Sequence, residues 1–99
     1  MNNATEITIW EKCLQIIKDN LSQTSFKTWF SPIKPVQFQD NKITLQLPSF
    51  FFYEYIEENY APLLKKILHK VTGENIKIEY KVLTDSGNDT FTTLPDTNS

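Results

Sequence analysis

The pattern of apolar and polar positions at the start of the chain predicts two helices. From Ile7 to Asn20, apolar residues recur every three or four positions and charged residues occupy the other side, which is typical of an amphipathic helix. Ser22 or Thr24 can cap a second, short helix. This helix ends before Pro32, because a proline disfavours helical geometry in the residue that precedes it.

The second helix carries three aromatic residues, Phe26, Trp29 and Phe30, at positions i, i+3 and i+4. Residues with this spacing share one face of a helix, and large apolar side chains on one face are most often core. We therefore expect Phe26 and Trp29 to be buried. The polar side of the helix, a kind of surface that is usually just solvated, is formed by Gln23, Ser25, Lys27 and Thr28.

Two-residue alternation predicts three β-strands. The first two form a hairpin, in which Val36 and Phe38 alternate with glutamines and Asp40-Asn41 suits a two-residue turn with positive φ. The apolar positions of the other strands are Ile43, Leu45 and Leu47 in the second, and Ile76, Ile78, Tyr80 and Val82 in the third. The predicted sheet therefore has one face for helices and one for water.

A long helical stretch lies between the second and third strands. Pro48-Ser49 supplies a stop and a cap, and helical periodicity continues until Gly73. Pro62 predicts either a kink or a break into two helices, with Pro62 in the first turn of the second. The buried stripe of the last portion consists of Leu63, Leu64, Ile67, Leu68 and Val71.

The start of this stretch, FFFY at 50–53, crowds four rings into one helical turn. A helix turns by about 100° per residue, so it cannot point all four rings at one core. If Phe52, Ile56 and Tyr60 form the buried line, Phe51 faces away from the core. The side of the helix that Phe51 occupies also carries Glu54, Tyr55 and Glu58.

Composition and charge limit the function. The 99 residues are enough for one domain with a modest core, without a deep substrate cleft between lobes. Up to Val82 the chain carries ten lysines, nine acidic residues and no arginine. Arginine is the usual reader of guanine edges and clamp for phosphates, so its absence argues against sequence-specific DNA reading and phosphoryl transfer.

The end of the chain differs from the rest. Residues 83–99 contain three aspartates and many Ser, Thr and Asn, without a hydrophobic period. This composition is typical of an interdomain linker or a disordered end. We therefore predict a domain over residues 1–82 and the start of a flexible linker over 83–99, with a further domain in the parent protein.

Candidate catalytic and metal-ligating residues are few. Cys13 is the single cysteine, and no Cys/His set has zinc-ligand spacing. Glu57-Glu58 fits a solvated helix turn, and His69 has no second ligand or nucleophile near it. We expect no catalytic residue, metal or cofactor in this chain. With no signal peptide or membrane-spanning stretch, we expect a cytoplasmic protein without membrane contact.

Three segments of the chain resemble the N-terminal domain of the bacterial chromosomal replication initiator family, DnaA. They are "IWEKCLQIIKDNLSQTSFKTWFSPI", "NKITLQLPSFFFYEYIEENYAPLL" and "IKIEYKV", and together they cover about Ile9 to Val82. The motifs are W-x-x-C-L, an aromatic second helix ending in Pro, and a proline before the long helix. The resemblance implies a KH-like α+β fold, helix-helix-strand-strand-helix-strand, with a three-stranded sheet and helices packed on one face.

The resemblance also implies an interaction domain that acts in the initiation of DNA replication. In the family this domain self-associates, recruits the replicative helicase and binds regulators, while ATP belongs to an AAA+ domain of the full-length protein outside this chain. Self-association is linked to a tryptophan that matches Trp10. Helical phase places Trp10 on the apolar stripe, so it is either a core residue or a partly overhanging one.

Helicase contact in the family is linked to two positions. One is an aromatic residue that matches Phe51, and the other is an acidic residue whose place is taken here by Ser25, so contact there must be made differently or be weaker. The candidate contact residues for the helicase or regulators are Phe51, Ser25, Lys27, Glu54 and Glu58.

Two alternatives stay open. A KH-like module would bind single-stranded nucleic acid, but the connection NLSQTS lacks the GXXG loop that grips the strand, which leaves only weak binding through Lys34, Lys42 and Lys77. The other alternative is an adaptor domain of a different protein.

Overall fold

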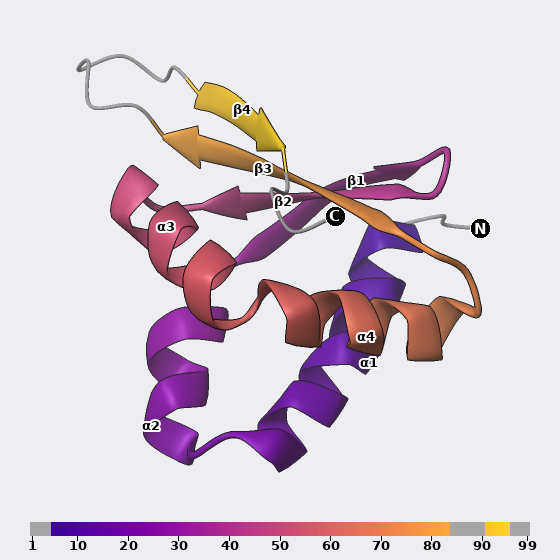
Figure 1. Ribbon diagram of the computed structural model, residues 1–99, viewed down its shortest axis with the longest axis horizontal. Helices are drawn as coiled ribbons and strands as arrows, with labels where there is room; N and C mark the ends of the chain where they lie inside the picture. Colours follow the sequence, from indigo (N-terminus) through magenta and orange to yellow (C-terminus); the bar gives the residue numbers. More distant parts are fainter. Residues whose placement is uncertain (1–4, 84–90, 96–99) are drawn as a thin grey trace.

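The computed structural model describes residues 5–83 and 91–95, which form a mixed β-sheet with helices on one face (Figure 1). In chain order the elements are α1 (Thr5–Asn20), α2 (Gln23–Ser25), η1 (Phe26–Phe30), β1 (Lys34–Gln39), β2 (Lys42–Leu47), α3 (Phe50–Asn59), α4 (Ala61–Thr72), β3 (Lys77–Leu83) and β4 (Phe91–Pro95). η1 is a π-helical turn that continues α2, so the two form the predicted second helix. The predicted α+β fold class is confirmed.

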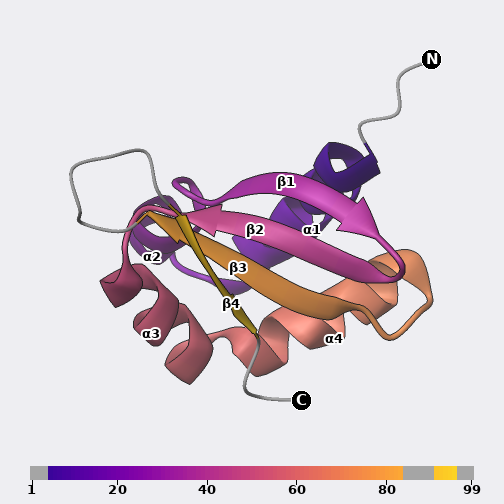
Figure 2. The ribbon, with the colours of Figure 1, turned by 90° about the horizontal axis from the view of Figure 1, so that it is seen from above.

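The order of strands in the sheet is β1-β2-β3-β4. β1 and β2 pair antiparallel as the predicted hairpin, while β2 and β3 are parallel and are connected through α3 and α4 (Figure 2). β4 pairs antiparallel with β3, with Phe91 opposite Leu83 and Pro95 opposite Glu79. β4 was not predicted. It lies in the segment 83–99, whose role as a linker stays a prediction.

The hairpin confirms its predicted turn but contains an irregularity that the alternation did not reveal. Asp40 and Asn41 have φ values of 54° and 55°. In β1 the register shifts between Pro35 and Gln37, so Val36 is an extra residue on this strand. Val36 is 37% exposed, and its assignment to the apolar face was wrong.

The predicted helix ends are confirmed by hydrogen bonds and backbone geometry. The hydroxyls of Ser22 and Ser49 each accept a bond from the backbone N–H three residues later, as N-caps do. Of the two outcomes expected at Pro62, the structure has the break, with Pro62 in the first turn of α4. Gly73 ends α4 with a φ of 78°, and its N–H donates to the carbonyl of His69.

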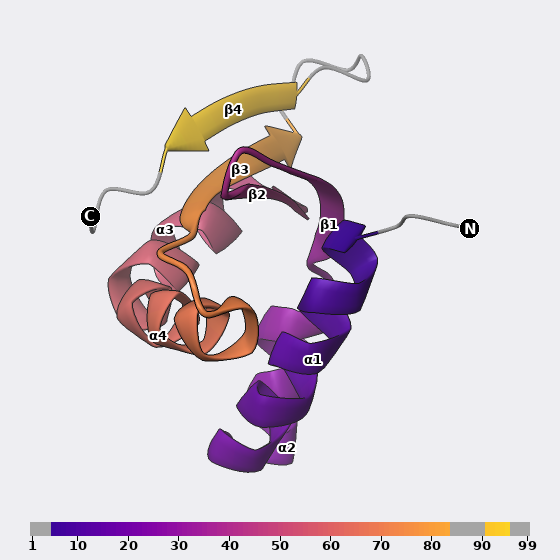
Figure 3. The ribbon, with the colours of Figure 1, turned by 90° about the vertical axis from the view of Figure 1, so that its right-hand side faces the viewer.

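The core lies between the sheet and the helices, and Figure 3 shows the two layers with α1 and α4 beneath the strands. The predicted apolar positions of the second and third strands are all 5% exposed or less: Ile43, Leu45, Leu47, Ile76, Ile78, Tyr80 and Val82. The helices contribute Trp10, Cys13, Ile17, Phe30, Ile56, Leu64, Ile67 and Leu68. Leu63 and Val71 complete the predicted stripe of α4 but are only partly buried.

Three burial expectations require correction. Glu57 is 7% exposed, although a solvated turn was predicted. Phe26 and Trp29 are half-buried, whereas Phe30 is the ring of the second helix that is fully buried. The helix is also wider here than an α-helix, because Ser31 donates to the carbonyl of Phe26, five residues back, at 3.2 Å.

Candidate functional site

An aromatic cluster joins the second helix to α3. The Trp29 ring of η1 stacks on Tyr55 of α3 with 3.6 Å between ring centroids. Phe52 and Phe51, also on α3, lie 5.1 Å and 6.1 Å from Trp29. We call these four residues the aromatic cluster. Since aromatic pairs add to the stabilisation that area burial provides, the cluster holds the start of α3 against η1.

Phe51 is the exposed edge of the aromatic cluster. The Ser49 cap sets the start of α3, and the resulting phase turns Phe51 outward with 64% of its surface exposed. Glu54 and Glu58 follow at three and seven positions along α3, and both are exposed on the same side of the helix. The prediction that Phe51 faces away from the core is confirmed.

Phe50 is a second exposed ring that was not among the candidate residues. It is 52% exposed, and its ring centroid lies 5.5 Å from that of Tyr53. Tyr53 in turn contacts Tyr80 of β3 at 5.4 Å, so Phe50 adjoins the sheet whereas Phe51 adjoins η1. The signal was present in the run FFFY, which cannot bury every ring.

Ser25 and Lys27 lie on different sides of the second helix. Ser25 precedes Trp29 by four positions, so it shares the side of the aromatic cluster, where it is half-buried. Lys27 precedes Trp29 by two positions and is exposed on the other side. There it lines a cleft of about 530 Å³ that is formed by Lys18, Leu21, Gln23, Phe26, Lys27 and Ser31. The structure thus groups Ser25, but not Lys27, with Phe51.

Trp10 is a core residue. Only 2% of its surface is exposed, so the alternative in which it overhangs the domain was wrong. Within residues 5–83 and 91–95, its indole Nε1 has no hydrogen-bond acceptor. A side chain without surface cannot touch a second copy directly. Ile7, earlier on α1, is 44% exposed and is the large apolar side chain that this helix presents to solvent.

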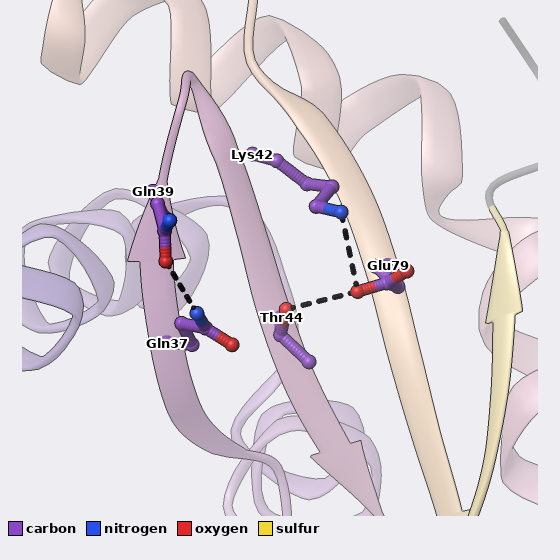
Figure 4. A network of polar contacts seen from close by, with 5 residues as sticks. All are labelled: Gln37, Gln39, Lys42, Thr44 and Glu79. Atoms are coloured by element: carbon purple, nitrogen blue, oxygen red, sulfur yellow. Dashed lines mark hydrogen bonds and ion pairs between the residues drawn. The ribbon is translucent and has the colours of Figure 1, made fainter.

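The polar face of the sheet carries a small network of contacts (Figure 4). Lys42 Nζ on β2 lies 3.6 Å from Glu79 Oε1 on β3, and Thr44 Oγ1 donates to the same oxygen at 3.3 Å. On β1, Gln37 Nε2 donates to Gln39 Oε1 at 2.7 Å. Lys42, one of the three lysines considered for contact with single-stranded nucleic acid, is therefore already paired with a carboxylate.

Titratable and metal-ligating groups form no centre in the part of the chain that the structure describes. Cys13 is fully buried, and burial raises the pKa of its thiol to about 12, so it stays protonated at neutral pH. Among the same residues, no group of three or more His, Cys, Asp or Glu side chains is placed to hold a metal ion. No described helix combines the length and apolar character needed to cross a bilayer.

The fold and this surface define a small α+β domain that presents an aromatic edge beside two carboxylates. Residues 7–70 match the family described as the DnaA N-terminal domain. The chain is 49% identical over 80 residues to the chromosomal replication initiator protein DnaA of Flavobacterium psychrophilum, covering 81% of this chain and 17% of that protein. It is 42% identical over 85 residues to the Bacteroides fragilis protein of the same name, covering 86% and 18%.

The chain belongs to the DnaA N-terminal domain family, as the resemblance implied. It spans less than a fifth of the length of these relatives. The match therefore concerns their N-terminal part.

Proposed function

We propose that this chain is the protein-interaction domain of a chromosomal replication initiator, which self-associates and captures the replicative helicase or initiation regulators in the cytoplasm. The observation that carries the proposal is Phe51, a phenylalanine 64% exposed on a domain of the DnaA N-terminal family. An exposed ring is common by itself, but this one occupies the position that the family resemblance links to helicase contact. Catalysis and ATP binding would belong to other parts of the full-length protein.

Phe51 has the features of a binding hot spot. Its ring rests against Trp29, so its orientation is supported before a partner arrives, which lowers the entropy lost on binding. Glu54 and Glu58 place two carboxylates beside it. Ser25 contributes no charge, so the acidic character of this contact comes from α3. A partner with an apolar pocket and basic residues at its rim fits such a surface.

For self-association, we propose that Trp10 acts by position rather than by contact. Its buried ring anchors the first turns of α1 to the core, and Ile7 is the exposed apolar residue that those turns present. A change at Trp10 would then impair association by displacing α1.

The helicase contact is tested by capture of the cognate replicative helicase with immobilised wild-type domain and Phe51→Ala. We expect the dissociation constant to rise about 30-fold, which corresponds to the roughly 2 kcal/mol threshold of a hot spot. The stability loss should be about 1 kcal/mol, because truncating a fully buried phenylalanine to alanine costs about 3–5 kcal/mol and only about a third of the surface of Phe51 is buried.

Phe50→Ala is the matched control, since it removes an equally large exposed ring that adjoins the sheet instead of η1. It should capture the helicase as the wild type does. Equal capture by Phe51→Ala and wild type would show that the contact lies elsewhere. A large drop in the melting temperature of Phe51→Ala would instead place this ring in the core.

Weak binding of single-stranded nucleic acid remains the alternative, because Lys34 and Lys77 are exposed and form no salt bridge among the described residues. Titration with a short oligonucleotide at several salt concentrations tests it. Backbone contacts would give an affinity that falls steeply with salt and falls again in Lys34→Gln/Lys77→Gln.

A further inference from the structure

Two surfaces of this domain carry opposite charges, and one is hollow where the other projects. The first is the cleft between the end of α1 and the second helix, which we call the basic cleft. Leu21 and Phe26 give it an apolar lining, Lys18 and Lys27 supply two ammonium groups, and none of its six lining residues is acidic. Its volume of about 530 Å³ falls within the roughly 300–1,000 Å³ of typical ligand pockets, which is ample for one aromatic side chain.

The second surface is the exposed side of α3, where Phe51 projects next to Glu54 and Glu58. We call these three residues the acidic knob. Neither its carboxylates nor the ammonium groups of Lys18 and Lys27 form a salt bridge within the described residues. Within the part of the chain that the structure describes, all four charges are therefore available for a contact with another molecule.

We propose that the acidic knob of one copy docks in the basic cleft of a second copy. Phe51 would enter between Leu21 and Phe26, and the carboxylates beside it would pair with Lys18 and Lys27. This inference rests on the proposed self-association and gives it a second surface, distinct from the α1 turns around Trp10.

The contact must form between molecules and must be head-to-tail. Within one chain the knob meets the second helix on the Trp29 side, whereas Lys27 and the cleft lie on the other side of that helix. A knob therefore does not reach its own cleft. Each docked pair leaves one free knob and one free cleft, so further copies add in the same orientation, as in other heterologous assemblies. Because the helicase is proposed to use Phe51 too, helicase capture and this contact exclude each other.

The size and chemistry of the contact predict how it behaves. One ring and two ion pairs make a small interface of the weak, transient class. Exposed ion pairs are screened by salt, with a Debye length of about 8 Å at 0.15 M. Association should therefore require high protein concentration and weaken as salt is added. An apolar contact through Ile7 would not weaken in this way.

The test is sedimentation equilibrium of the 99-residue chain at low and at high salt, with two variants that each lose one surface. Lys18→Gln/Lys27→Gln disables the cleft, and Glu54→Gln/Glu58→Gln disables the knob. Each variant alone should raise the apparent dissociation constant for self-association by about 2- to 30-fold, from the loss of two exposed ion pairs. An equimolar mixture should recover one knob–cleft contact for each pair of molecules, because each variant supplies the surface that the other lacks.

The matched control is Lys42→Gln/Lys77→Gln, which removes the same charge from the polar sheet face and should associate as the wild type does. If the wild type associates and both surface variants associate equally well, head-to-tail docking is wrong while self-association stands. If the wild type stays monomeric at every concentration, both are wrong. The four side chains substituted in the two surface variants are exposed, so the melting temperatures of these variants should equal that of the wild type. Concentration-dependent NMR shifts of Phe26 and Phe51 in the wild type provide a readout that needs no variant.

Discussion

Trp10→Ala should destabilise this domain strongly, whatever it does to self-association. Trp10 is 2% exposed and is among the largest fully buried side chains. Truncating a buried tryptophan to alanine costs about 3–5 kcal/mol, a large part of the roughly 5–15 kcal/mol by which native domains are stable. In a domain of this size, each kcal/mol lowers the melting temperature by about 4–8 °C. The expected drop is therefore at least about 12 °C.

The assay combines thermal melts followed by circular dichroism with sedimentation at a temperature where the variant is still folded. Trp10→Phe is the control, because it keeps a ring in the site and leaves a smaller cavity. A melting temperature of Trp10→Ala within about 4 °C of the wild type would refute the placement of Trp10 in the core. If Trp10→Ala has normal stability but no longer self-associates, Trp10 contacts the second copy directly.

Two further predictions concern backbone geometry and pH. Gly73→Ala should lower the free energy of unfolding by about 1 kcal/mol in urea denaturation, because Gly73 has a φ of 78° and an added Cβ would meet no atom within 4 Å, so the cost is conformational alone. Gly73→Asn should lower the free energy of unfolding less than Gly73→Ala does, because asparagine adopts positive φ more readily. Burial raises the pKa of the Cys13 thiol from 9.0 to about 12, so the unfolded chain loses this proton first as pH rises. The contribution of the protonated thiol to the free energy of unfolding is therefore complete below pH 9.0. It is lost between pH 9.0 and about 12. Cys13→Ala should remove this part of the pH dependence. If the free energy of unfolding falls equally steeply with pH in the wild type and in Cys13→Ala, the thiol is not its source.

Features that depend on neighbours within a few residues were predictable from the sequence. The caps at Ser22 and Ser49 and the turn at Asp40-Asn41 use local hydrogen bonds and local backbone preferences. The alternation in β2 succeeded for a related reason. β2 lies inside the sheet between two partners, so its apolar side chains have one core to face.

The errors concern contacts between distant parts of the chain. Val36 does not lie on the apolar face, because the register of β1 on β2 shifts between Pro35 and Gln37. The burial of Glu57 and of Trp10 depends on what packs against their helices, which the period of a single helix does not contain. By contrast, the helical phase of α3 alone was enough to predict that Phe51 faces outward. The separation of Lys27 from Phe51 required the positions of α1, η1 and α3 together.

β4 determines where the chain leaves the domain. Without it, the backbone would depart from the sheet at Leu83, the last residue of β3. With it, the path turns back along β3 and reaches Pro95 opposite Glu79, four residues and about 13 Å away at the rise of a β-strand. Tension on the chain beyond Pro95 would then act first on the β3–β4 hydrogen bonds, so this short strand would give way before the domain does. Its release would free Phe91–Pro95 from β3 without unfolding the surface that carries Phe51.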